Sequence, residues 1–184
     1  IVQGELYTIG QTGKKGLTVF DSNALIAGHA KYVTFNGKVE SAPRMHAKVG
    51  DKIRIYVGNG GVNLISSFHV IGEIFDTVYP EGSLGENGAV HKNVQTTAVL
   101  PGGSSIVEFI VDVPGKFLLV DHALARMNMG AWAVLEVTGE KNSDIYSQVP
   151  NEYKVNSTST ESSQSEIIPS ENNEYGAMPE MEGH

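Results

Sequence analysis

The stretch from Tyr32 to Gly139 consists of short apolar runs separated by turns rich in Gly, Asn and Pro. We find no long segment there in which apolar residues recur with the period of a helix. Many short strands with frequent turn signals are typical of a β-sandwich or a β-barrel. The sequence therefore predicts an all-β fold that closes into one compact sandwich.

The strand signals are clearest where side chains alternate between apolar and polar. In residues 105–111, Val107 and Phe109 fall on one face and Glu108 on the other, as the two-residue period of a strand requires. Four further segments, bounded by Gly, Pro or Asn, are also predicted to be strands because they are short and mainly apolar. They are residues 32–35, 52–57, 116–120 and 131–137.

The chain divides into three parts by composition. Its 184 residues, 40% of them hydrophobic, are enough for one core of roughly 100–150 residues plus extensions. We assign residues 1–31 to an interdomain arm with a short helix at residues 21–27, and residues 32–142 to the folded domain. Residues 143–184 form a polar C-terminal extension, expected to be disordered because it is too polar to repay the entropy of ordering.

Composition excludes several classes of function. The net charge of −8 argues against nucleic acid as a partner, because phosphate binding needs clustered Lys and Arg. The absence of cysteine excludes disulfides, thiolate catalysis and metal sites that need a cysteine ligand. No run approaches the roughly 20 apolar residues of a membrane span. The start at Ile1 shows neither Met nor a signal peptide, so we expect an upstream segment.

The reactive side chains that remain are histidines, and His69 and His122 stand out. His69 lies within an uncharged apolar strand, and His122 stands where the chain leaves the strand of residues 116–120. A histidine at the end of a strand can point out of the rim of a sandwich and bind a metal. A buried, hydrogen-bonded structural histidine is the alternative for each. Two histidines do not complete a catalytic metal site, which typically has about three protein ligands.

Several segments resemble one known family. The run of residues 57–76, which contains His69, looks like the central segment of the second domain of copper-containing nitrite reductases, in particular of the outer-membrane type found in Neisseria. Residues 1–8, 101–103 and 114–122 match further segments of that domain in the same order. The resemblance covers residues 1 to about 147. It implies a cupredoxin-type Greek-key β-sandwich.

The resemblance also implies an activity. Members of this family are homotrimers whose subunits hold two cupredoxin domains, a type 1 blue copper for electron entry and a type 2 copper that reduces nitrite to nitric oxide. His122 matches the one type 2 ligand that the second domain supplies across a subunit interface. His69 matches the histidine that delivers protons to nitrite. Ile71 and Leu124 match the apolar pocket, and Thr97 or Gln95 would orient His69.

The departures from the family are equally informative. The type 1 ligands, the other two type 2 histidines and the catalytic aspartate belong to a first domain that this sequence does not contain. Asp121 stands where a blue-copper domain would have its cysteine. We therefore expect copper at His122 alone, and activity only after assembly with the first domain.

The resulting hypothesis is that the chain is the C-terminal half of a copper nitrite reductase. Its expected partners are the first domain, neighbouring subunits of a homotrimer, a cytochrome c or cupredoxin electron donor, and nitrite. The expected location is the periplasm, the outer membrane or the cell surface. The alternative is a non-catalytic cupredoxin-like assembly module. A multicopper oxidase is disfavoured, because no His-X-His motif occurs.

Overall fold

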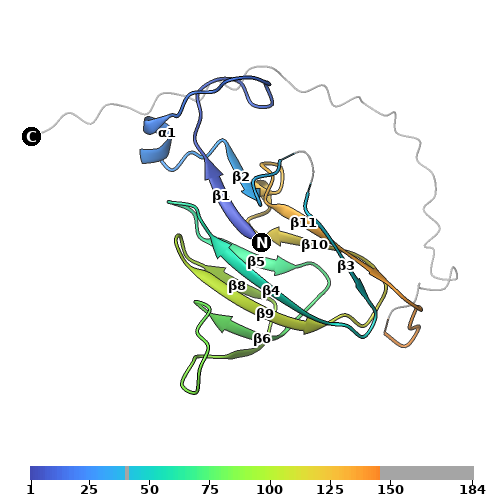
Figure 1. The fold of residues 1–184 in the computed structure, drawn as a ribbon. Helices are drawn as coiled ribbons and strands as arrows, with labels where there is room; N and C mark the ends of the chain where they lie inside the picture. Colours follow the sequence, from blue (N-terminus) through green and yellow to red (C-terminus); the bar gives the residue numbers. More distant parts are fainter. Residues whose placement is uncertain (40–41, 146–184) are drawn as a thin grey trace, which may run out of the picture. The chain divides into compact units, whose positions relative to one another are not determined.

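The computed structural model describes residues 1–39 and 42–145 (Figure 1). These residues form strands, one short α-helix and one 3-10 turn, and the predicted all-β fold is confirmed. In chain order the elements are β1 (Val2–Leu6), α1 (Ser22–Ile26), β2 (Tyr32–Phe35), β3 (Arg44–Lys48), β4 (Lys52–Asn59), β5 (Ser66–Val70), β6 (Phe75–Pro80), β7 (His91–Val94), β8 (Thr96–Val99), β9 (Ser104–Ile110), β10 (Gly115–Asp121), η1 (Leu124–Arg126) and β11 (Trp132–Thr138).

The strands form two sheets. One has six strands in the order β2-β1-β4-β9-β6-β7, and the other has five in the order β3-β11-β10-β5-β8 (Figure 1). Neighbouring strands run antiparallel, except that β1 runs parallel to β4 and β3 parallel to β11. Strands that follow one another in sequence therefore often lie in different sheets, which is the behaviour expected of a sandwich.

Four fully buried phenylalanines join the two sheets. Phe68 comes from β5 of the five-stranded sheet, whereas Phe35, Phe75 and Phe109 come from the six-stranded sheet. The Phe68 ring centroid lies 6.1 Å from those of both Phe35 and Phe75, and Phe75 lies 5.9 Å from Phe109. These separations are favourable for aromatic pairs, so the strand that carries His69 is anchored at the centre of the core.

The predicted N-terminal arm, residues 1–31, contributes a strand to the sandwich. β1 pairs with β2 over four residues and with β4 over two. Its strand character is hidden in the sequence because a polar side chain, Gln3, is its buried member and accepts a hydrogen bond from the Ser66 hydroxyl at 2.7 Å. The short predicted helix is present as α1, capped by Asp21, which accepts a hydrogen bond from the Ala24 amide at 2.9 Å.

The predicted polar extension, residues 143–184, lies outside the described residues from position 146 onward, and its disorder stays a prediction. Within residues 1–39 and 42–145, no helix is long and apolar enough to cross a membrane.

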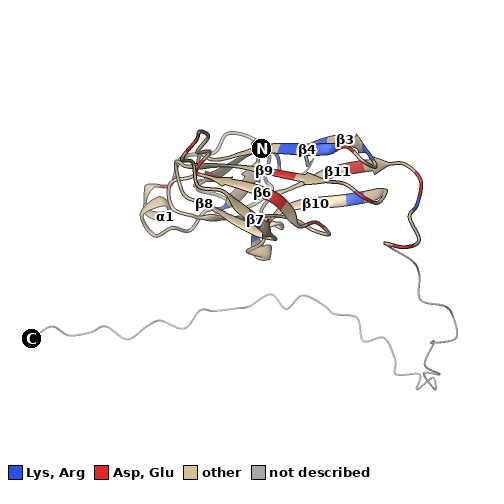
Figure 2. Cartoon of the chain, turned by 90° about the horizontal axis from the view of Figure 1, so that it is seen from below, with Lys and Arg blue, Asp and Glu red and all other residues tan. Residues whose placement is uncertain are grey.

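A buried carboxylate lies on the outer face of the six-stranded sheet. Glu108 of β9 is only 3% exposed, and it contacts Lys52 Nζ at 3.3 Å and Arg54 Nε at 2.5 Å on β4. Figure 2 shows this charge pairing as a blue segment of β4 beside a red segment of β9. Burial favours the neutral carboxyl, but the hydrogen bonds and charges of Arg54 and Lys52 outweigh it and lower the pKa of Glu108.

Candidate functional site

The pairing of β5 with β10 brings His69 and His122 together. His69 stands opposite Val120, and the His122 amide donates to the Ser67 carbonyl at 2.8 Å, which extends the pairing by one step. Side chains two residues apart on a strand share a face, so both histidines project from the same side of the five-stranded sheet. Their ring centroids lie 5.3 Å apart, with 56° between the ring planes.

His69 is the buried member of the pair, with 9% of its surface exposed. Its Nδ1 lies 2.5 Å from the backbone carbonyl oxygen of Gln95, and its ring centroid lies 6.5 Å from that of Phe75, with 62° between the ring planes. Because a carbonyl oxygen only accepts hydrogen bonds, Nδ1 carries a hydrogen here. Nε2 is then the ring atom that can take up and release a proton.

His122 is the exposed member of the pair and follows directly after β10. Its surface is exposed, and among the described residues no hydrogen bond engages its ring. The ring lines an open depression of about 470 Å³ together with Ser67, Gln95, Thr96 and Ala123. An imidazole in this position suits a transition metal such as copper.

His122 is an isolated ligand within this part of the chain. No group of three or more His, Asp or Glu side chains in residues 1–39 and 42–145 is arranged to hold a metal ion. A site with about three protein ligands would therefore take the others from outside these residues.

The two predicted pocket residues each follow one of the histidines by two positions. Ile71 lies just beyond β5, where its amide donates to the Leu118 carbonyl at 2.8 Å, and its surface is 41% exposed. Leu124 begins η1 and is 47% exposed. Apolar surface therefore stands exposed near the histidine pair.

The two predicted orienting residues behave differently. Gln95 contacts His69 through its backbone carbonyl, whereas Thr97 pairs with Phe68 and is 6% exposed. The register partner of His69 is Thr96, which the sequence pattern does not single out. Because a backbone carbonyl makes the contact, the identity of the Gln95 side chain carries no signal for it.

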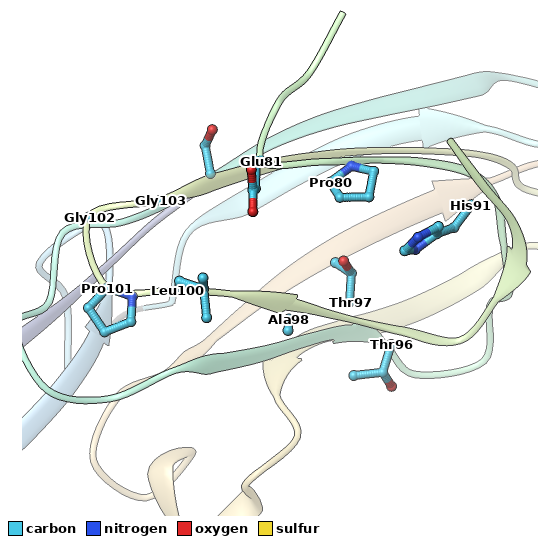
Figure 3. Close-up of a pocket in the computed structure, with 11 residues that line it drawn as sticks. Pro80, Glu81, His91, Thr96, Thr97, Ala98, Leu100, Pro101, Gly102 and Gly103 are labelled. Carbon is cyan, nitrogen blue, oxygen red and sulfur yellow. The ribbon is translucent and has the colours of Figure 1, made fainter. Parts of the chain in front are cut away.

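A second cavity, of about 670 Å³, opens between the edges of the two sheets, beside β8 and the end of β6. Figure 3 shows Thr97, His91 and Pro80 around it. Neither His69 nor His122 lines this cavity, so we do not assign the histidine chemistry to it.

Comparisons with known proteins identify relatives of this chain. No family model matches the chain. Over 152 residues the chain is 51% identical to the copper-containing nitrite reductase of Neisseria gonorrhoeae, and 50% identical to that of a serogroup B strain of Neisseria meningitidis. The resemblance to copper nitrite reductases is confirmed. The match covers 80% of this chain but 38% of each relative, so the chain spans well under half the length of these copper nitrite reductases.

Solved structures agree with this result. The chain superposes on copper nitrite reductases from Thermus scotoductus SA-01 and Nitrosomonas europaea with a TM-score of 0.60 and 28% identity in each case. These matches cover 77% of this chain and 30% and 48% of those chains, respectively. A multicopper oxidase matches with a TM-score of 0.56 at 21% identity, which supports the fold alone. The cupredoxin-type fold predicted from the sequence is confirmed.

Proposed function

We propose that this chain is the C-terminal part of a copper nitrite reductase that reduces nitrite to nitric oxide. In this proposal His122 is a ligand of a type 2 copper at a subunit interface, and His69 delivers protons to nitrite. The observation that carries the proposal is the histidine pair, with one exposed and one buried ring 5.3 Å apart, in a chain similar to copper nitrite reductases over 80% of its length.

The metal half of the proposal rests on the donor chemistry of His122. A single accessible imidazole, with no further metal-binding cluster in the described residues, fits a site that is shared between chains. The remaining type 2 ligands would come from a first domain, and the shared site implies a symmetric assembly, which we take to be a homotrimer. The type 1 copper belongs to the first domain, because this chain has no cysteine to bind it.

The proton half rests on the hydrogen bond of His69. Reduction of nitrite consumes one electron and two protons and yields nitric oxide and water, so a group that is an acid near neutral pH must stand beside the bound nitrite. The copper, when bound, supplies the electron and acts as a Lewis acid. The Gln95 carbonyl accepts the hydrogen bond of Nδ1–H of His69. Nε2 is therefore the atom that donates a proton to nitrite and is then protonated again by water.

The exposed apolar side chains near the pair fit the same proposal. Ile71 and Leu124 would be covered by the first domain of a neighbouring subunit, so that water has limited access to the bound nitrite. A cytochrome c or cupredoxin donor and a location in the periplasm or at the outer membrane or cell surface are also part of the proposal. Their support is the resemblance alone.

Two substitutions in the complete protein test the two halves separately. His122→Ala should remove the type 2 copper and leave the blue type 1 copper in place. His69→Gln should retain both coppers and lower turnover by about 100-fold or more, the usual contribution of an acid–base group. His46→Gln, on β3 with a 72% exposed side chain, is the matched control and should change neither property.

The opposite results would reject the proposal. If His122→Ala keeps its full copper content, His122 is not a ligand, and the chain is then better described as a non-catalytic assembly module. If His69→Gln turns over nitrite at the rate of the parent with an unchanged pH profile, His69 does not deliver protons.

A further inference from the structure

A buried carboxylate stands next to His122 in the chain. Asp121, the last residue of β10, has no exposed surface. Its Oδ1 accepts hydrogen bonds from the Ser67 amide at 3.2 Å and the Ala123 amide at 3.1 Å. Its Oδ2 accepts a hydrogen bond from Arg126 Nη1 at 2.6 Å. Both carboxylate oxygens are therefore used, as a buried charge requires.

Arg126 extends this network to the start of β5. Its side chain is 22% exposed, and the nitrogen that binds Asp121 also donates to the Ile65 carbonyl at 2.7 Å. The Asp121–Arg126 ion pair therefore connects three segments: the residues that lead into β5, the turn after β10, and η1. Charge-assisted hydrogen bonds of this length are the stronger ones in proteins.

His122 lies inside this network but does not use its ring for it. Its backbone is held on both sides, by its own bond to the Ser67 carbonyl and by the bonds of Asp121 to Ser67 and Ala123. The direction of its Cα–Cβ bond is thus fixed, while its exposed ring makes no hydrogen bond within the described residues. Since Ser67 also lies two residues before His69, the same contacts fix the spacing of the two backbone positions from which the rings project.

We propose that Asp121 and Arg126 are positioning residues that hold the His122 imidazole in the orientation in which it binds copper. The inference rests on the proposed function, because it assumes that His122 is a copper ligand. Groups that orient a metal ligand typically contribute about 10–100-fold to metal affinity. We expect loss of the ion pair to weaken type 2 copper binding by a factor in this range.

The variants are Asp121→Asn, Arg126→Met and Arg126→Lys in the complete protein. Asp121→Asn keeps an oxygen for the two amides and removes the charge, Arg126→Met keeps an apolar stem and removes the donors, and Arg126→Lys keeps the charge with a single donor group. The control is Arg44→Met, which removes an exposed ion pair with Glu136 in the same sheet.

Two readouts are needed. Competition with a chelator measures the affinity for type 2 copper, with the electron paramagnetic resonance spectrum of the bound copper as a test of ligand geometry. Hydrogen–deuterium exchange of residues 121–127 in copper-free protein measures the order of the turn itself. A purely structural role would lower thermal stability without changing the copper spectrum of the folded protein.

The inference predicts that Asp121→Asn and Arg126→Met weaken type 2 copper binding by about 10–100-fold, alter its spectrum and speed exchange in residues 121–127. Arg126→Lys should recover part of the loss, and Arg44→Met should match the parent. If Asp121→Asn does not fold, Arg126→Met decides. Parent-like copper affinity and exchange in Arg126→Met would overturn the inference. Failure of the parent itself to bind type 2 copper would reject the proposed function. In that case, hydrogen–deuterium exchange of residues 121–127 that is as slow in Arg126→Met as in the parent would separately reject the positioning role.

Discussion

Asn59 offers a direct test of how β8 is held against β5, the strand that carries His69. Asn59 ends β4 and is 2% exposed. Its Nδ2 donates to the Leu64 carbonyl at 2.8 Å and to the Val99 carbonyl at 2.9 Å, and its Oδ1 accepts from the Gly61 amide at 3.0 Å. One side chain therefore joins the loop that leads into β5 to the end of β8.

Asn59→Ala removes all three hydrogen bonds. At about 1 kcal/mol for each bond, the free energy of unfolding should fall by about 3 kcal/mol. The loss should be somewhat larger if water does not reach the Leu64 and Val99 carbonyls that lose their donor. Urea denaturation followed by the fluorescence of the single tryptophan, Trp132, measures this change. The slope of the free energy of unfolding against urea concentration should be the same in variant and parent. The exposed loop variant Asn87→Ala is the control and should change stability by less than about 0.5 kcal/mol. A loss below about 1 kcal/mol for Asn59→Ala would refute the reasoning.

Three further predictions concern charge and packing. Glu108→Gln should destabilise the protein at neutral pH, because the bonds to Arg54 outweigh burial and lower the pKa of the Glu108 carboxyl in the folded state. The difference in free energy of unfolding between variant and parent should shrink as pH falls below the ordinary pKa of a carboxyl group. Urea denaturation that gives the same difference at pH 3 and pH 7 would contradict this. Burial, with the charge of Asp112 second, raises the pKa of Glu73 from 4.5 to about 7, so the parent should lose stability as pH rises through that interval. Glu73→Gln should remove this loss and be more stable than the parent above pH 7, and equal pH profiles in thermal unfolding would argue against it. Phe68→Ala should cost about 3–5 kcal/mol in urea denaturation, since a fully buried ring is deleted, and a cost near zero would mean that the core can refill the space.

The strand at residues 105–111 was accessible from the sequence because its side chains follow the two-residue period of a strand. Residues 105–111, where Glu108 lies between Val107 and Phe109, correspond to β9 within one residue at each end. β1 was not accessible in this way. Its buried residue, Gln3, is polar and is accommodated by Ser66, a partner more than 60 positions away.

The site was accessible only in part, because its geometry depends on strand register. His69 and His122 are far apart in sequence and meet through the pairing of β5 with β10. The contact of Gln95 with His69 uses a backbone carbonyl, which leaves no mark on residue choice. Asp121 stood out as a missing cysteine, but its bond to Arg126 depends on the turn that η1 makes. The roles of these residues in copper binding and proton delivery stay predictions.

The central claim is that this chain works as the copper-sharing part of a nitrite reductase. The most direct test is the intact mass and the copper content of the protein purified from its source before any denaturing step. We predict that a first-domain polypeptide accompanies the chain, covalently or otherwise, with about two coppers for each pair of domains, since metal content follows the ligands present. A chain that purifies alone and without copper would contradict the claim.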